Sequence, residues 1–267
     1  MEKFKNFEKY LKEKFNYKKK VSINLINCEV CNKKNFDVIT NKSLLSSKKN
    51  LYVYFPYSLC ENCGHAQQIF RLNKDFYNNY YNNVLTQNTS RNKKYPERLK
   101  NTITRGKILL KLLEQKLNLR FKNQKVLDIG CGHGGMLLEF HQKKCQVVGI
   151  DPDKNALNFS KKKYPYLNLI NQSAEKMNFK KNSFDLIIIN GSLEHVYDVN
   201  MVMKKVGKYL KKNGYLFLEG KGYPLDKKEN YFNFSHHRLF TKNSFSNLCA
   251  KYQIFKLTTS YKSPLNI

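Results

Sequence analysis

The strongest structural signal in this chain is the stretch Asp128-Ile129-Gly130-Cys131-Gly132-His133-Gly134. The apolar pair Val126-Leu127 precedes it, and the helix-favouring run Met136–Phe140 follows it. A strand that ends in glycines and opens a helix exposes backbone N–H groups, and glycine lets that backbone come close to a ligand. The stretch therefore predicts a cofactor crevice at the carboxyl end of a first strand.

From residue 125 onward, apolar runs alternate with helical patterns. Five of these runs are expected to be strands, at residues 126–129, 146–150, 167–170, 184–190 and 215–219. The fourth contains the unbroken apolar stretch Leu186–Ile189, which suits a parallel strand buried on both faces. This alternation predicts an α/β fold, with a doubly wound, mostly parallel sheet of the Rossmann-like type.

We predict four segments along the chain. They are an amphipathic helix over residues 1–20, a cysteine-bearing module over 21–70, a helical linker or cap over 71–120, and a cofactor-binding catalytic domain over 121–267. The first segment places lysines between apolar residues at helical spacing (Phe4, Phe7, Leu11 and Phe15). We expect this helix to dock on the protein's own body, and binding to a membrane surface is the alternative.

Composition limits the classes of partner. The 267 residues carry a formal charge of +29, from 49 Lys and Arg against 20 Asp and Glu. Only six of the basic residues are Arg, whereas readers of nucleic acids favour Arg forks. An AT-rich genome explains the Lys and Asn excess, and a nucleic-acid surface is the alternative. We expect no nucleic-acid partner, although the charge favours an anionic small-molecule acceptor.

Hydropathy bears on location. No run of 18 apolar residues occurs, so no insertion into a membrane is expected. The Lys-rich start of the chain lacks the apolar core of a secretory signal. We therefore expect a cytoplasmic location.

Two carboxylates distinguish the possible cofactors. Asp128 lies two residues before the first glycine of the turn, where it would repel a pyrophosphate but suit a ligand with an amine. Asp151 ends the second expected strand, where a carboxylate can bind both hydroxyls of a ribose. A helix N-cap is the alternative role for Asp151, and the two roles can coexist.

The chain resembles class I S-adenosylmethionine-dependent methyltransferases over about residues 100–260. Five segments carry the resemblance, in the family's order: Val126–Gly134, Gly149–Pro152, Ala174-Glu175 with the run Phe184–Asn190, Leu193–Val196 and Lys211–Leu216. The resemblance implies that S-adenosylmethionine is the methyl donor, and it implies a set of cofactor-binding residues. These are Asp128, Gly130, Cys131, Gly132, Gly134, Asp151, Pro152, Ala174, Glu175, Asn190 and Leu193.

The resemblance also implies roles. The backbone of the glycine turn would approach the methionine portion, and Asp128 would hold its amino group. Asp151 would hold the ribose, and Ala174 with Glu175 would border the adenine.

Four cysteines form two pairs, Cys28-x-x-Cys31 and Cys60-x-x-Cys63. Two such pairs can complete a tetrahedral zinc site, and a site closed by four thiolates supports folding rather than catalysis. Thiols are the expected form in the cytoplasm, so disulfides are not expected. The alternatives are a redox role or unpaired cysteines.

A Cys₄ module ahead of such a domain resembles one branch of the family, the methyltransferases of deoxysugars and surface-polysaccharide precursors. The segment His236–Thr241 is also similar to one that follows the fifth strand in that branch. The resemblance to the sugar C-methyltransferases is incomplete, because we expect neither their further C-terminal α/β domain nor the usual last antiparallel strand from this sequence. We therefore expect methylation of oxygen rather than carbon.

Methylation of a hydroxyl requires removal of its proton, and histidine is the side chain most easily poised for that near neutral pH. The candidates are His195 after the fourth strand, His236 and His237 after the fifth, and Glu219 at its end. His195 could instead orient a helix, and Glu219 could bind acceptor hydroxyls or simply end a strand.

The resulting hypothesis is a zinc-containing methyltransferase that O-methylates a nucleotide-linked sugar or another capsule or polysaccharide precursor. An RNA methyltransferase is the first alternative, favoured by the charge. A scaffold that binds the cofactor without turnover is the second.

Overall fold

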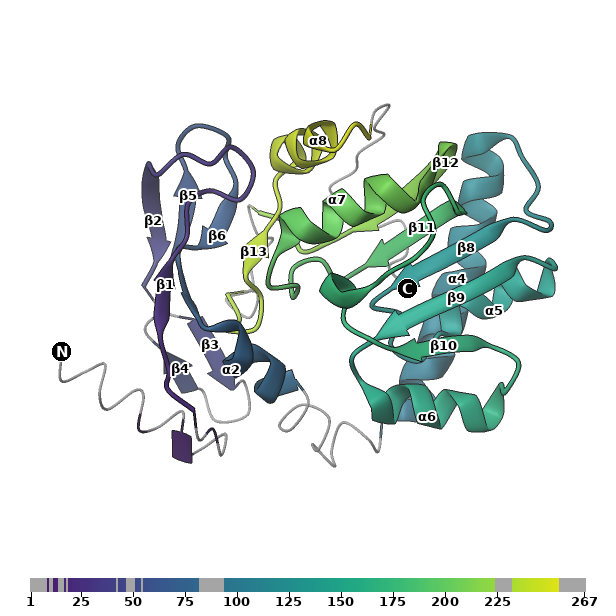
Figure 1. Cartoon of the computed structure of the whole chain (residues 1–267), viewed down its shortest axis with the longest axis horizontal. Helices are drawn as coiled ribbons and strands as arrows, with labels where there is room; N and C mark the ends of the chain where they lie inside the picture. Colours follow the sequence, from purple (N-terminus) through teal and green to yellow (C-terminus); the bar gives the residue numbers. More distant parts are fainter. Residues whose placement is uncertain are drawn as a thin grey trace.

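The computed structural model describes residues 9, 12–13, 17, 19–41, 43–46, 51–53, 55–81, 94–223 and 232–254. Figure 1 shows a small strand-rich module beside a larger sheet with helices. The apolar positions of the predicted N-terminal helix, Phe4, Phe7, Leu11 and Phe15, lie outside the described residues. The division into four segments stays a prediction.

The larger sheet confirms the predicted α/β fold. Its five strands are β8 (Lys125–Ile129), β9 (Gln146–Asp151), β10 (Asn168–Asn171), β11 (Phe184–Asn190) and β12 (Leu210–Glu219). They lie in the order β10-β9-β8-β11-β12, and every neighbouring pair is parallel. The order reverses between β8, the first of these five strands along the chain, and β11, the fourth. Doubly wound sheets bind ligands at such a point, beyond the carboxyl ends of the strands.

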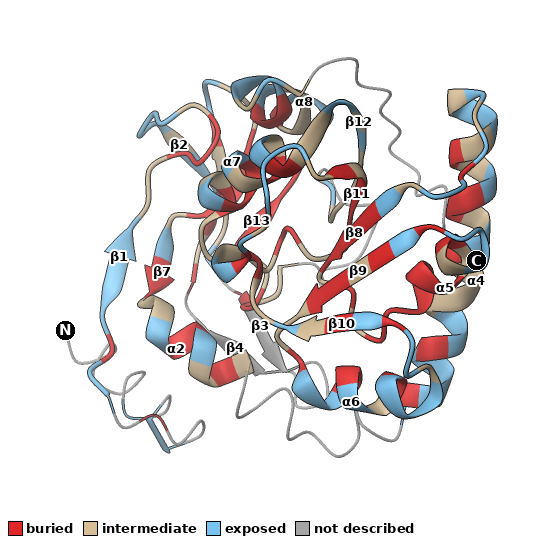
Figure 2. Cartoon of the chain, turned by 45° about the vertical axis from the view of Figure 1, so that its right-hand side comes forward, coloured by how far each residue is buried: buried red, intermediate tan, exposed pale blue. Residues whose placement is uncertain are grey.

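Helices cover both faces of this sheet. The side chains of Val126, Leu186 and Ile188 pack with α4 (Tyr95–Leu117), α5 (Gly135–Gln142) and α6 (Lys154–Lys163). On the other face, Leu127, Ile187 and Ile189 pack with α7 (Val199–Tyr209) and α8 (Lys242–Lys251). Figure 2 shows the resulting burial, which is most continuous along α5. Alternate residues of one strand therefore serve two cores, as a central strand requires.

The smaller module is built from short antiparallel strands. They are β1 (Ile23–Leu25), β2 (Phe36–Thr40), β3 (Ser43–Ser46), β4 (Leu51–Val53), β5 (Tyr57–Cys60), β6 (Ala66–Gln68) and β7 (Phe70–Leu72), followed by α2 (Lys74–Asn79). The module's four-stranded sheet has the order β13-β6-β5-β2, and β13 (Arg238–Leu239) comes from far along the chain. The segment after β12 therefore returns to complete the N-terminal module, between the two bodies in Figure 1.

A buried ion cluster joins the module to the larger sheet. Glu29, between the first two cysteines, receives two hydrogen bonds from Arg71 at 2.7 and 2.8 Å and two from Arg238 at 2.7 and 2.9 Å. All three side chains are at least 94% buried. Burial alone would raise the pKa of Glu29, but Arg238 and Arg71 hold that pKa well below its usual range.

The cluster has one more positive than negative charge, and its guanidinium groups also donate hydrogen bonds to backbone carbonyl oxygens. Arg238 donates to the carbonyls of Leu193 at 2.6 Å and Val196 at 2.8 Å, and Arg71 donates to that of Tyr197 at 3.0 Å. The chain segment that follows β11 is thereby tied to both β7 and β13.

We expect Glu29→Gln to lower the free energy of unfolding by about 3–5 kcal/mol, because it leaves two buried guanidinium groups without a counter-charge. Urea unfolding measures the change. The matched control is Asp75→Asn, which removes an exposed ion pair with Lys19 and should cost at most about 1 kcal/mol. Equal effects of the two variants would contradict this reading of the cluster.

Candidate functional site

The glycine turn lies at the carboxyl end of β8 and contacts the turn after β11. Gly130 has φ +78°, and a Cβ atom there would lie 2.3 Å from the Cβ atom of Ser192. The Ser192 hydroxyl donates to the carbonyl of Ile129 at 2.7 Å. Only glycine tolerates both this φ and this approach, so Gly130 allows the two turns to pack together at the switch point of the sheet.

Asp128 and Asp151 meet beside this turn. The Asp128 side chain is buried, and its burial together with the charge of Asp151 raises the pKa of Asp128 to about 8. Asp151 accepts hydrogen bonds from the backbone N–H groups of Gly132 at 2.8 Å and Asp153 at 2.7 Å. The acid ahead of the glycines is therefore predominantly protonated at neutral pH until a cation or amine pairs with it.

The alternative role of Asp151 as a helix N-cap is wrong. The N-cap of α6 is Asp153, whose side chain accepts from the backbone N–H groups of Asn155 and Ala156. Asp151 lies two residues before Asp153, and its side chain accepts a hydrogen bond from the backbone of the glycine turn. Pro152, between the two, is half-buried, and its carbonyl accepts from the Asn171 side chain.

The remaining cofactor candidates differ in their burial and in their hydrogen bonds. Cys131 and Ala174 are buried, and Leu193 packs in the core under α7. Glu175 accepts a hydrogen bond from the backbone N–H of Tyr197 at 2.8 Å, so its carboxylate is engaged with the segment after β11. At the end of β11, the Asn190 Nδ2 atom is buried and has no hydrogen-bond partner within the described part of the chain.

His195 and His236 come together, with ring centroids 4.6 Å apart. The Nδ1 atom of His195 lies 3.0 Å from the carbonyl oxygen of Ser235 and 2.8 Å from the Tyr81 hydroxyl. Because a carbonyl can only accept, the Ser235 contact favours the tautomer with the proton on Nδ1, which places the lone pair of the neutral ring on Nε2. That nitrogen can take a proton or bind a metal.

The other two catalytic candidates are used elsewhere. His237 is fully buried with its ring 4.4 Å from that of Tyr77, and burial with Arg71 and Arg238 lowers its pKa well below the usual range. It is therefore a neutral core histidine. Glu219 pairs with Arg105 of α4 at 2.6 Å.

Sequence reasoning missed Glu194. Its side chain is fully buried, neither carboxylate oxygen has a hydrogen-bond partner among the described residues, and burial raises its pKa. A Cβ atom on Gly191 would lie 3.9 Å from its Oε1 atom, so the carboxylate faces the turn after β11. Its position next to His195 was visible in the sequence, but no local pattern shows that an acidic side chain is buried.

The four cysteines converge as the spacing predicts. The Sγ atoms of Cys28 and Cys63 are 3.4 Å apart, those of Cys31 and Cys60 are 3.5 Å apart, and all four lie within 4.8 Å of one another. Each pair forms the same tight turn, in which the residue after the second cysteine donates to the carbonyl of the first at 2.8 Å. Thiolates at such separations suit tetrahedral zinc, whose bonds to sulfur are about 2.3 Å long.

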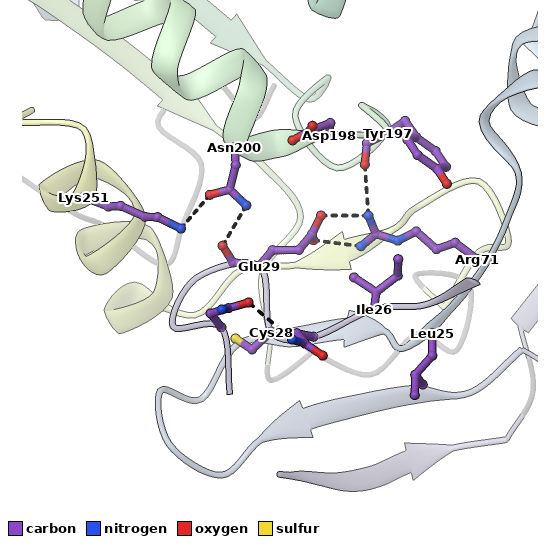
Figure 3. A pocket seen from close by; sticks show the side chains of 11 residues that line it. Leu25, Ile26, Cys28, Glu29, Arg71, Tyr197, Asp198, Asn200 and Lys251 are labelled. Atoms are coloured by element: carbon purple, nitrogen blue, oxygen red, sulfur yellow. Dashed lines mark hydrogen bonds and ion pairs between the residues drawn. The ribbon is translucent and has the colours of Figure 1, made fainter. Parts of the chain in front are cut away.

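A separate pocket of about 440 Å³ lies beside the ion cluster (Figure 3). Glu29, Arg71 and Asn200 line it, and Asn200 donates to the carbonyl of Glu29 at 3.0 Å. None of its lining residues belongs to the glycine turn or the histidine pair.

Among the described residues, the structure contains no helix with the length and apolar composition of a membrane span.

Comparisons with known proteins match part of this chain to methyltransferases. Residues 127–218 match the family described as "Methyltransferase domain". The chain is 39% identical over 101 residues to a ubiquinone biosynthesis O-methyltransferase from Pelagibacter ubique, covering 36% of this chain and 42% of that protein. It is 31% identical over 102 residues to a probable (S)-tetrahydroprotoberberine N-methyltransferase 2 from Papaver bracteatum, covering 36% and 28%.

A solved structure, the YcgJ protein from Bacillus subtilis, is 24% identical with a TM-score of 0.46 and covers 54% of this chain and 67% of that one. The chain spans less than half the length of the curated relatives it matches.

Asp128 gives a pH-dependent stability that can be measured without any ligand. Its pKa rises from 3.8 to about 8 on folding, so the folded protein keeps a proton that the unfolded chain has lost. We expect the free energy of unfolding to fall as pH rises between about 5 and 8, by up to about 1.4 kcal/mol per pH unit. In Asp128→Asn this contribution is absent, and urea unfolding of both proteins across that range measures the difference. Parallel curves for the two would show that Asp128 titrates normally.

Proposed function

Starting from the methyltransferase domain of residues 127–218, we propose that the protein is an S-adenosylmethionine-dependent methyltransferase with a small-molecule acceptor. One observation carries the proposal. Within the matched region, a glycine turn lies between two carboxylates, Asp128 and Asp151, at the carboxyl ends of neighbouring parallel strands. A ligand with one amine and one ribose suits this pair of acids better than a dinucleotide does.

The chain's own residues would hold the cofactor as follows. Deprotonated Asp128 would pair with its ammonium group, and Asp151 would accept from the ribose hydroxyls, since a carboxylate oxygen can accept more than one hydrogen bond. The backbone of residues 130–134 would lie against the methionine portion. The unpartnered Nδ2 atom of Asn190 fits a polar ligand here. Ala174 and Glu175 would border the adenine. When bound, the cofactor supplies an electrophilic methyl group.

For the acceptor, we propose a hydroxyl on a nucleotide-linked sugar or another polysaccharide precursor. Its phosphate would suit the basic charge of the chain, and its hydroxyl would lie near His195 and His236. The 4.6 Å separation of their rings and their partial exposure support the choice of these two among the four candidates. The anionic acceptor and the cytoplasmic location remain predictions from the sequence.

For the cysteines, we propose one structural zinc ion held by Cys28, Cys31, Cys60 and Cys63. The two matching turns and the close sulfur atoms support it. Glu29 lies inside the first turn, so a zinc ion there would also hold the carboxylate of the buried ion cluster in place.

The cofactor assignment predicts that the purified protein binds S-adenosylmethionine in calorimetry. We expect Asp128→Asn to weaken binding by about 30-fold or more, because truncating one partner of a buried charge pair costs about 2 kcal/mol or more. The matched control is Asp37→Asn, which removes an exposed carboxylate in β2. If the native protein fails to bind, the methyltransferase proposal is wrong.

Equal affinity of Asp128→Asn and the native protein would refute the role of Asp128 alone. The acceptor class is tested separately, by transfer of labelled methyl groups to nucleotide-linked sugars and to RNA. Incorporation into RNA, with binding that weakens steeply with salt, would favour the RNA methyltransferase alternative.

The zinc assignment predicts one zinc ion per purified chain, measured by elemental analysis. Cys60→Ser should lose that zinc and unfold at a lower temperature, because a structural zinc site contributes directly to folding. Cys145→Ser is the matched control, since Cys145 is also buried but lies outside the cluster. Full zinc content in Cys60→Ser would contradict the assignment.

A further inference from the structure

The carboxylate of Glu194 lacks a counter-charge in direct contact. Its side chain is fully buried, and neither oxygen has a hydrogen-bond partner among the described residues. A buried ionised carboxylate is costly unless a cation or hydrogen-bond donors compensate it. Arg238, a nearby buried cation, is already committed to Glu29 and to two carbonyl groups. The carboxylate therefore faces a position that a bound cation could occupy.

Two imidazoles lie beside this carboxylate. One potential ligand atom each from Glu194, His195 and His236 lies within 4.8 Å of the others. Glu194 and His195 come from the segment after β11, and His236 comes from the segment that leads into β13. Both histidines are partly exposed, so an ion in solution can reach the cluster.

The hydrogen bonds of His195 prepare it as a ligand. Its Nδ1–H is directed at the Ser235 carbonyl, 3.0 Å away, and the Tyr81 hydroxyl lies 2.8 Å from the same nitrogen. Metal-binding histidines usually donate their second ring N–H to a carbonyl or carboxylate, which fixes the tautomer and the ring orientation. The lone pair on Nε2 is the one that can bind an ion.

We propose that Glu194, His195 and His236 bind one divalent transition-metal cation beside the cofactor crevice, separate from the Cys₄ cluster. Two imidazoles with one carboxylate leave coordination positions open, as in catalytic rather than closed structural sites. The nitrogen ligands distinguish this set from the all-oxygen shells that calcium and magnesium prefer.

The position suggests what the ion does. Oε1 of Glu194 lies 3.9 Å from where a Cβ atom of Gly191 would be, and Gly191 directly follows β11 at the switch point of the sheet. An open coordination position there would hold an oxygen atom of the acceptor. This role rests on the proposed methyl transfer, whereas binding of the metal does not.

The test is a titration of the zinc-loaded protein with Mn²⁺, followed by electron paramagnetic resonance. Mn²⁺ favours oxygen and nitrogen ligands over thiolates, so it should leave the Cys₄ zinc in place. We expect one Mn²⁺ per chain in the native protein. Glu194→Gln keeps the shape of the side chain without its charge and should bind Mn²⁺ at least about 10- to 100-fold more weakly, the loss that even outer partners of a metal cause.

Two further variants complete the design. His236→Asn should lose Mn²⁺ to a similar extent, and it decides the question if Glu194→Gln does not fold. His141→Asn is the control, because His141 stacks on Tyr166 away from the cluster and should bind Mn²⁺ as the native protein does. Absence of Mn²⁺ binding in the native protein overturns the proposal, and so does undiminished binding in both cluster variants.

The same samples separate this inference from the proposed function. S-adenosylmethionine binding without Mn²⁺ binding would overturn the metal site and leave the methyltransferase proposal standing. Binding of Mn²⁺ at Glu194 without S-adenosylmethionine binding would overturn the methyltransferase proposal and leave the metal site standing. A rise in melting temperature with Mn²⁺ in the native protein, absent in Glu194→Gln, would support the site independently of spectroscopy.

Discussion

The rest of the structure depends on one interaction, the buried ion pairs that the carboxylate of Glu29 makes with two arginines. These arginines are distant in sequence, Arg71 of β7 and Arg238 of β13. Removing Glu29 would leave two buried guanidinium groups without a counter-charge, so the three segments come together around this carboxylate. The carbonyl groups that saturate the arginines belong to the segment after β11, which carries the candidate catalytic residues.

The N-terminal module thereby helps to position the two candidate catalytic histidines, His195 and His236. β13 pairs with β6, and His236 lies two residues before β13, so the module's sheet determines where His236 lies relative to His195. Tyr81, which follows α2, contacts the Nδ1 atom of His195. A zinc ion in the cysteine cluster would act on the same geometry, because Glu29 lies between Cys28 and Cys31. Folding of the module and placement of the two histidines are therefore linked.

Much of the fold was predictable because its determinants are local. Strand positions follow from apolar runs, and the glycine turn follows from residues that must adopt positive φ or allow close approach. The largest departure is β12, which begins at Leu210 and includes a register shift opposite Phe184. The start of β12 is not evident from the sequence, because the polar residues 211–213 of this edge strand resemble a turn.

The sequence by itself determined the parallel sheet, the glycine turn at the end of its first strand, and the two cysteine pairs, since each depends on spacing within a few residues. Only the tertiary structure decided which polar side chains are buried and which meet. His236 and His237 are neighbours in sequence, yet one lies beside His195 and the other packs against Tyr77. Glu194 became a candidate ligand only through the return of the chain beside it. Such roles depend on contacts between distant segments, which no local pattern encodes.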